Sequence, residues 1–182
     1  VLAANNIALA SKFQKAFSND YFRVYTSKDV TGVEVGGCVK NVIAIASGIC
    51  SGLGMGDNTL AALLSRSLEE IKRLGFFLKA EQSTFNGLSG LGDLIVTSFS
   101  CHSRNRSVGI RLATGESLRD IQANGFYAEG ILAAKIVNSL AVKNNIDMPI
   151  CNQIYNILYK GKDPRKGIDE LMTRELINET NN

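Results

Sequence analysis

The apolar residues change their spacing near residue 30, and the two patterns predict two different kinds of structure. Before that point, Asn5 or Asn6 can cap a helix. This helix carries apolar residues at Ile7, Leu9, Ala10, Phe13 and Phe17. Residues 22–26 then alternate in the manner of a strand, and residues 1–4 read as an earlier strand. Strand, helix and strand in this order are typical of the edge of a parallel α/β sheet.

After Gly32 the apolar spacing is helical throughout, and no persuasive strand follows residue 30. Capping residues mark several of the expected helices. Asp57 or Asn58 can cap the helix expected at residues 60–74, Gly75 and Gly115 can each close a helix, and residues 117–120 have the form of a capping box. The expected helical stretches are 35–49, 60–74, 104–113, 129–142, 150–159 and one that starts at Pro164. The sequence therefore predicts a mainly α fold. An all-helical domain over residues 31–182 follows a short β-α-β segment over residues 1–30.

Composition and charge narrow the range of function. The 182 residues are 45% hydrophobic and 20% charged, as in ordinary globular proteins. A net charge of +3 without a dense basic run argues against a nucleic-acid partner. No apolar run approaches 18 residues, so we expect no integral membrane segment. The four cysteines fit no zinc spacing and are expected to be reduced thiols, which favours the cytoplasm.

The most informative stretch runs from Gly87 to Arg106, where three glycines precede an acid, a hydroxyl and an Arg-Asn pair. Asp93 and Thr97 are four residues apart, so a helix would place them on one face. Together they could hold a substrate hydroxyl or orient a lysine. The plainer interpretation is that Asp93 is the N-cap of a helix that begins after the glycines, and both interpretations can hold at once.

Ser103 can cap a second helix that opens with Arg104 and Asn105. A helix N-terminus with an arginine beside it suits a phosphate group, because free N–H groups and a forked cation point at the same place. The alternative is a plain capped helix without a ligand. Arg106 is expected to point away into solvent.

Lys40 lies in a strongly apolar helical segment, three residues after the Gly36-Gly37 pair. Burial disfavours the charged ammonium, so a lysine held there could act as a general base near neutral pH. The alternative is a lysine whose stem packs on the core while its head stays in water. Two glycines inside a helix also suggest that something packs closely against it.

In order along the chain, several strings resemble one family. These are residues 22–34, Lys40-Asn41, residues 52–58, residues 87–94, Ser103-Arg104-Asn105-Arg106 and Ala128-Glu129-Gly130. From Val1 to about Arg174, the chain resembles the C-terminal part of bacterial NAD(P)-dependent glycerol-3-phosphate dehydrogenases. The strings are individually short, but their order and separations together are specific.

The resemblance implies that residues 31–182 are a helical substrate-binding and catalytic domain like the C-terminal domain of 6-phosphogluconate dehydrogenase. It implies that residues 1–30 are the C-terminal edge of an N-terminal Rossmann NAD-binding domain, the rest of which is absent here. Such enzymes use NAD or NADP to interconvert dihydroxyacetone phosphate and sn-glycerol 3-phosphate for phospholipid synthesis. The resemblance also implies a cytoplasmic enzyme acting on a small-molecule substrate, with a homodimer as a plausible state.

By the same resemblance, Lys40 is the general acid/base, and Asp93 supports it. The implied substrate-binding residues are Asn41, Asp93, Thr97, Ser103, Arg104 and Asn105. The implied cofactor-binding residues are Arg104, Tyr127 and Glu129. No metal site is implied.

The sequence departs from the family in two respects: it lacks the glycine-rich dinucleotide fingerprint and the family's second catalytic lysine. We therefore expect that this chain alone does not turn over substrate. Two other interpretations are a related hydroxyacid dehydrogenase and a non-catalytic helical dimerisation module.

Overall fold

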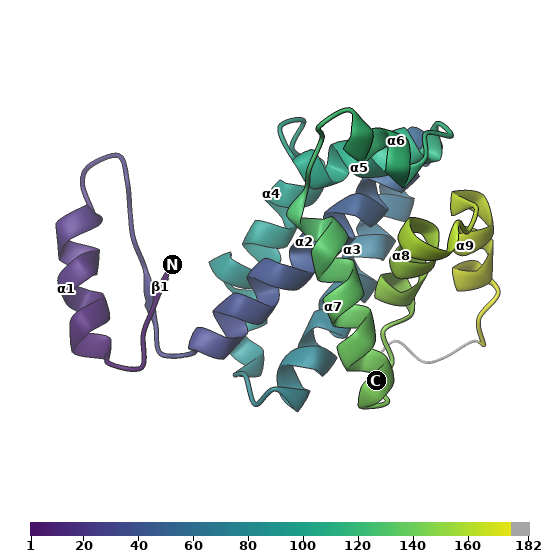
Figure 1. Cartoon of the computed structure of the whole chain (residues 1–182). Coiled ribbons are helices and arrows are strands. Elements are labelled where there is room, and N and C mark those ends of the chain that lie inside the picture. Colours follow the sequence, from purple (N-terminus) through teal and green to yellow (C-terminus); the bar gives the residue numbers. More distant parts are fainter. Residues whose placement is uncertain (176–182) are drawn as a thin grey trace.

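The computed structural model describes residues 1–175, which form a small β-α-β unit followed by a helical body (Figure 1). The small unit comprises β1 (Leu2–Ala3), α1 (Ile7–Phe17) and β2 (Thr26–Ser27). The first half of the body comprises α2 (Val30–Gly52), α3 (Asp57–Phe77), a 3₁₀ turn η1 (Gln82–Asn86), a π-helical turn η2 (Leu88–Gly92) and α4 (Asp93–Phe99). The second half comprises α5 (Arg104–Ala113), α6 (Leu118–Ala123), α7 (Glu129–Lys143), α8 (Pro149–Lys160) and α9 (Pro164–Met172). This arrangement confirms the predicted fold class.

In the small unit the two strands run parallel, with Leu2 paired to Thr26. Asn6 caps α1 by accepting the N–H groups of Ala8 and Leu9, as expected. The strand expected at residues 22–26 is misplaced, because only Thr26 of that stretch belongs to β2.

A local turn explains the difference. The Asn19 side chain accepts the backbone N–H groups of Tyr21 and Phe22 and bends the chain there. The alternating residues before Thr26 therefore lead from this turn to the sheet instead of extending the strand.

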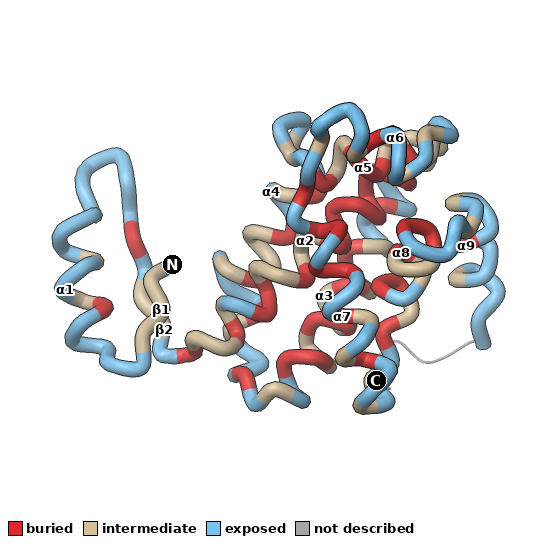
Figure 2. Tube along the Cα trace, viewed as in Figure 1, coloured by how far each residue is buried: buried red, intermediate tan, exposed pale blue. Residues whose placement is uncertain are grey.

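Helix α2 forms the centre of the body, and its middle is buried on all sides (Figure 2). An 18-residue window of this 23-residue helix has a mean hydropathy of 1.4, so by length and composition alone α2 could cross a membrane. However, 67% of the apolar window is buried inside the protein. A helix that is hydrophobic all round and covered by other helices is the core of a bundle.

Helices α2 and α5 cross with their backbones in contact. A Cβ atom on Gly48 would lie 2.0 Å from the carbonyl oxygen of Arg106, and one on Gly109 would lie 2.0 Å from that of Ile45. Only glycine permits such an approach. The crossing holds α5, and the residues at its N-terminus, close against α2.

Two expected caps are wrong. Gly75 does not end α3, which continues to Phe77. A Cβ atom on Gly75 would lie 2.2 Å from the Cζ atom of Phe85, so glycine at this position leaves room for the Phe85 ring. Neither Asp57 nor Asn58 caps α3, because the cap position is Gly56 and no side chain bonds there. By contrast, Ser103 and Ser117 cap α5 and α6 as predicted.

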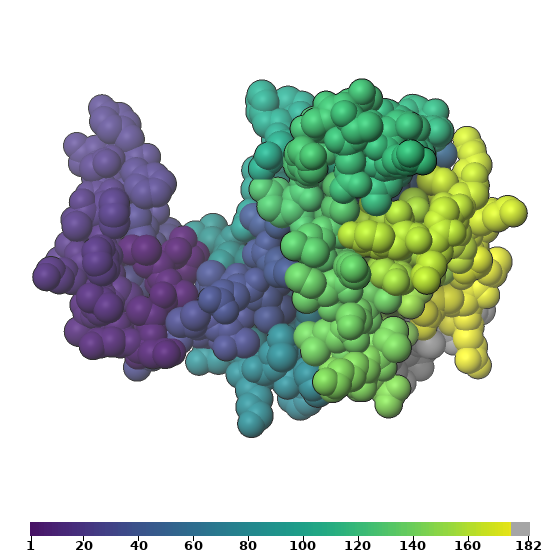
Figure 3. Space-filling model, in the orientation of Figure 1, coloured from purple at the N-terminus to yellow at the C-terminus, as the bar shows by residue number. Residues whose placement is uncertain are grey.

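The start of α2 is tied to the 3₁₀ turn η1 by one buried carboxylate. Asp29 accepts the N–H of Gly32 at 2.8 Å, the N–H of Glu81 at 2.9 Å and the hydroxyl of Thr84 at 2.6 Å. These bonds fix the first turn of α2 to the helical body. The β-α-β unit, in contrast, projects as a separate lobe (Figure 3).

Candidate functional site

An ion pair between Lys40 and Asp93 is at the centre of the candidate site. The Lys40 Nζ atom of α2 lies 2.5 Å from the Asp93 Oδ2 atom of α4, and the two side chains are 20% and 33% exposed. The hydroxyl of Thr97 donates to the other carboxylate oxygen, Oδ1, at 3.3 Å. The expected shared face of Asp93 and Thr97 is therefore present. The alternative role of Asp93 as a plain helix cap is not, because the cap position is Gly92.

The glycine-rich stretch allows this pairing by passing very close to α2. A Cβ atom on Gly36 would lie 2.8 Å from the carbonyl oxygen of Ser89 in η2. The π-helical turn then runs directly into α4, which begins at Asp93. Close packing at Gly36, one helical turn before Lys40, thus brings the carboxylate to the amine. Gly37 has no neighbour within 4 Å and does not share this role.

Three helices meet beside Lys40 through the side chains of two asparagines. The Asn105 amide nitrogen donates to Asn41 Oδ1 at 2.9 Å, and its oxygen accepts the N–H of Gly130 at 2.8 Å. Asn41 in turn donates to the carbonyl oxygen of Gly37 at 3.1 Å. Asn105 is only 4% exposed, so its amide joins α2, α5 and α7 from inside the protein.

Arg104 and Glu129 stand at the first positions of α5 and α7 and form an exposed ion pair. The Arg104 Nη2 atom lies 2.5 Å from Glu129 Oε1, and the side chains are 59% and 60% exposed. Ser103, the cap of α5, accepts the N–H of Arg106 at 3.3 Å. Arg104 therefore presents a cation at a capped helix N-terminus next to the Asn105 junction.

Two further residues complete the comparison with the sequence. Tyr127 is 64% exposed and lies two residues before Glu129, the first residue of α7. Arg106 was expected in solvent, but it is half-buried and donates to the Ser51 hydroxyl at 3.2 Å. The reason is the close α2–α5 crossing, which brings that end of α2 within reach.

Sequence reasoning missed one buried acid, Glu70 of α3, which is 1% exposed. Its carboxylate accepts the N–H of Ile150 at 2.6 Å and that of Cys151 at 3.1 Å, in the first turn of α8. Burial raises the pKa of Glu70 to about 7, and the two backbone bonds oppose this shift. A signal existed in the sequence: Glu70 lies three residues after Ser67 and four before Leu74, both of which face the core.

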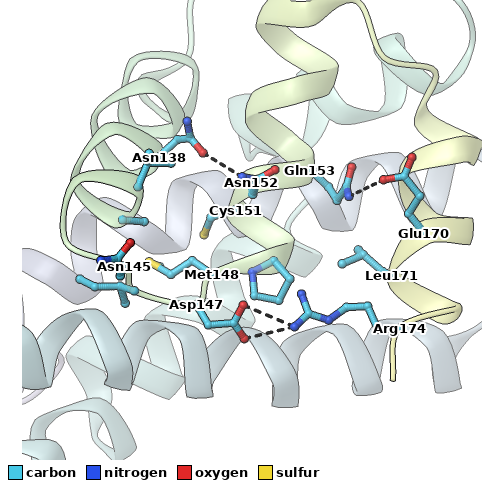
Figure 4. Close-up of a pocket in the computed structure, with 14 residues that line it drawn as sticks. Asn138, Asn145, Asp147, Met148, Cys151, Asn152, Gln153, Glu170, Leu171 and Arg174 are labelled. Carbon is cyan, nitrogen blue, oxygen red and sulfur yellow. Dashed lines mark hydrogen bonds and ion pairs between the residues drawn. The ribbon is translucent and has the colours of Figure 1, made fainter. Parts of the chain in front are cut away.

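Two cavities lie elsewhere in the body. One of about 520 Å³ is lined by residues around the start of α8, including Asn138, Met148 and Cys151, with the Asp147–Arg174 ion pair at its edge (Figure 4). A second, of about 550 Å³, is lined by residues of α2, α3, α8 and α9. None of the nine candidate residues lines either of these two cavities.

Comparison with known proteins agrees with this geometry. Residues 29–169 match the family model described as the C-terminus of NAD-dependent glycerol-3-phosphate dehydrogenase. The chain belongs to this family. Glycerol-3-phosphate dehydrogenase [NAD(P)+] of Solidesulfovibrio magneticus is 49% identical over 179 residues, which are 98% of this chain and 54% of the relative. The enzyme of Carboxydothermus hydrogenoformans is 52% identical over 171 residues, 93% of this chain and 51% of the relative.

Among solved structures, glycerol-3-phosphate dehydrogenase from Coxiella burnetii matches with a TM-score of 0.90 and 39% identity. The match covers 94% of this chain and 53% of that one. The chain thus spans about half the length of the curated glycerol-3-phosphate dehydrogenases that it matches. The resemblance inferred from the sequence is confirmed, and it argues against the two other interpretations, a hydroxyacid dehydrogenase and a dimerisation module.

Proposed function

We propose that this chain is the substrate-binding and catalytic half of an NAD(P)-dependent glycerol-3-phosphate dehydrogenase. The reaction is the reversible conversion of dihydroxyacetone phosphate to sn-glycerol 3-phosphate, which serves phospholipid synthesis. The observation that carries this proposal is the Lys40–Asp93 ion pair with Thr97 on the second carboxylate oxygen. A second group suited to the substrate is the Arg104 guanidinium, at the start of α5, the helix that packs against α2.

Lys40 is the proposed general acid/base. Reduction of the C2 carbonyl places negative charge on its oxygen, and the ammonium of Lys40 supplies the proton that this oxygen requires. In the reverse direction, the amine takes the proton back from the C2 hydroxyl. Asp93 fixes the position of Nζ, while Thr97 holds the carboxylate from its other oxygen.

The substrate phosphate is proposed to bind at the start of α5. Arg104 offers a planar fork of donors, and the capped N-terminus of α5 adds its dipole. The predicted substrate-binding residues also include Ser103, Asn41 and Asn105. Because the Asn105 side chain is hydrogen-bonded to Asn41 and to the N–H of Gly130, it also holds the start of α5 in place. Anchoring the phosphate holds C2 at a fixed distance from Lys40.

NAD or NADP is the proposed cofactor, and it supplies or accepts the hydride at C2. Arg104, Tyr127 and Glu129 are the residues of this chain proposed to contact it. All three side chains are polar and well exposed, which suits that role. Tyr127 and Glu129 lie at the N-terminus of α7, and Arg104 is paired with Glu129. We further propose a cytoplasmic enzyme, with a homodimer as its assembly.

The test is the oxidation of NADPH and NADH in the presence of dihydroxyacetone phosphate by the full enzyme that carries this sequence after a nucleotide-binding half. Replacement of Lys40 by alanine should lower kcat by at least about 10²-fold, as expected when a general acid/base is removed. Absence of turnover by the unchanged enzyme with both cofactors would refute the proposed reaction. Full activity of the Lys40→Ala variant would refute the role of Lys40. The 182-residue chain alone is expected to be inactive.

A further inference from the structure

The Arg104–Glu129 ion pair has a property that the proposed reaction does not require. Arg104 is the proposed anchor for a phosphate dianion, yet the atom 2.5 Å from its Nη2 belongs to a carboxylate. A carboxylate and a phosphate compete for the same face of a guanidinium, because both accept from adjacent N–H groups in the same plane. A negative charge fixed on an anion clamp also repels an incoming anion.

We propose that Glu129 is a displaceable counter-ion that competes with a phosphate oxyanion for the Arg104 guanidinium. The inference rests on the proposed phosphate site and adds a determinant of its affinity. When a phosphate binds, Glu129 leaves Nη2, and that nitrogen donates to a phosphate oxygen instead.

The geometry allows Glu129 to leave without disturbing the fold. Its side chain is 60% exposed, and that of Arg104 is 59% exposed, so both can rotate in solvent. The helices that carry them do not depend on the ion pair for their alignment. The N-terminus of α7 is bonded to α5 through the N–H of Gly130 and the buried Asn105 side chain. The pair is therefore a movable contact on a fixed junction.

The same helix provides a matched control. Arg111 of α5 forms an ion pair with Glu116, and there the carboxylate accepts from both Nε and Nη2. That pair closes the C-terminal end of α5, at the opposite end from Arg104. Glu116→Gln therefore removes an arginine's carboxylate partner of the same kind, away from the phosphate site.

The experiment titrates the 182-residue chain with inorganic phosphate at constant ionic strength, following the backbone amide signals of Arg104 and Gly130 by NMR. Glu129→Gln should bind phosphate roughly two- to fivefold more tightly than the unchanged chain, the range expected for coupling in an exposed ion pair. Glu116→Gln should bind like the unchanged chain. Arg104→Gln should lose the response to phosphate, both in the otherwise unchanged chain and in combination with Glu129→Gln.

The outcomes separate this inference from the proposed function. Equal or weaker binding by Glu129→Gln, with a response that still depends on Arg104, overturns the competition and leaves the phosphate site standing. Tighter binding by both Glu129→Gln and Glu116→Gln also overturns it, because the effect then comes from net charge. A chain that shows no Arg104-dependent response in any variant overturns both the competition and the phosphate site.

Discussion

The carboxylate of Glu70 lies inside the core and accepts the backbone N–H of Ile150 at 2.6 Å, so one helix of the body caps another. The free N–H groups at the start of α8 would otherwise be buried without partners. Their bonds to Glu70 join α3 to α8. The acid is thus structural, and it lies apart from the Lys40–Asp93 pair.

This buried acid should make stability depend on pH. The pKa of Glu70 is raised from 4.5 to about 7 in the folded protein, so the folded state holds a proton that the unfolded state has lost. The contribution of this group to stability is complete below about pH 4.5 and declines as the pH rises to 7. Between pH 5 and 8, it should lower the free energy of unfolding by about 2–3 kcal/mol.

Urea unfolding at several pH values tests this dependence in the unchanged chain and in Glu70→Gln. The variant cannot titrate at this position and should lack that part of the pH slope. Glu69→Gln is the matched control, because Glu69 is the preceding residue and is paired with Lys72 at the surface. It should keep the slope. Identical slopes for all three proteins would contradict the assignment to Glu70.

Replacing Asp93 by asparagine should impair catalysis more than binding. The side chain keeps its size, but Lys40 loses the charge that positions Nζ. In the full enzyme we expect kcat to fall by about 10²-fold, with a smaller change in KM for dihydroxyacetone phosphate. Asp147→Asn, which removes one partner of the exposed Asp147–Arg174 pair, should leave kcat unchanged. Steady-state kinetics decide the matter, and a normal kcat for Asp93→Asn would refute the role of this carboxylate.

Asn105→Asp should destabilise the helical body. The new carboxylate can still accept the N–H of Gly130, but it cannot donate to Asn41 Oδ1. A reversal of the Asn41 amide does not help, since Asn41 would lose its bond to Gly37. We expect a loss of at least about 2 kcal/mol, the cost of a buried polar group without its partner.

A second asparagine pair provides the comparison for this loss. Asn152 donates to Asn138 at 3.3 Å on the surface, and Asn152→Asp should change stability by less than about 0.5 kcal/mol. Thermal or urea unfolding of both variants measures the contrast. Equal effects at the two sites would show that the buried junction carries no special weight.

Alanine at the α2–α5 crossing should be poorly tolerated. In Gly48→Ala and Gly109→Ala the new methyl group would meet backbone oxygen at 2.0 Å, so the helices must move apart. We expect each change to lower stability by about 3 kcal/mol or more. Gly37→Ala should instead raise stability by about 0.5–1 kcal/mol, because it meets nothing within 4 Å and Ala favours a helix. Urea unfolding of the three variants separates these cases, and similar losses in all three would contradict the packing argument.

Periodicity and capping chemistry predicted the helices well, because both act within a few residues. Asn6, Ser103 and Ser117 cap helices where the sequence placed them. The long-range contacts were not predictable in this way. Gly75 has the signature of a helix end, but its place is determined by the ring of Phe85, ten residues later.

The candidate site shows the same division. The spacing of Asp93 and Thr97 put them on one face, and the structure places Thr97 on the carboxylate as expected. The partner of that carboxylate is Lys40, 53 residues earlier, and only the resemblance to the family brought the two together. The burial of Asn105 and the Arg104–Glu129 pair depend on how α5 and α7 meet, which no local pattern encodes.

The bonds that Asp29 makes to Gly32, Glu81 and Thr84 have a mechanical consequence. They join the first turn of α2 to the helical body that contains Lys40, while β2 ends at Ser27, only three residues before α2 begins at Val30. The connection from the β-α-β unit to this body is short, and within it the Ser27 hydroxyl accepts the N–H of Asp29 at 3.1 Å. The mutual spacing of Lys40, Asp93 and Arg104 is therefore independent of the angle at which the β-α-β unit meets the body.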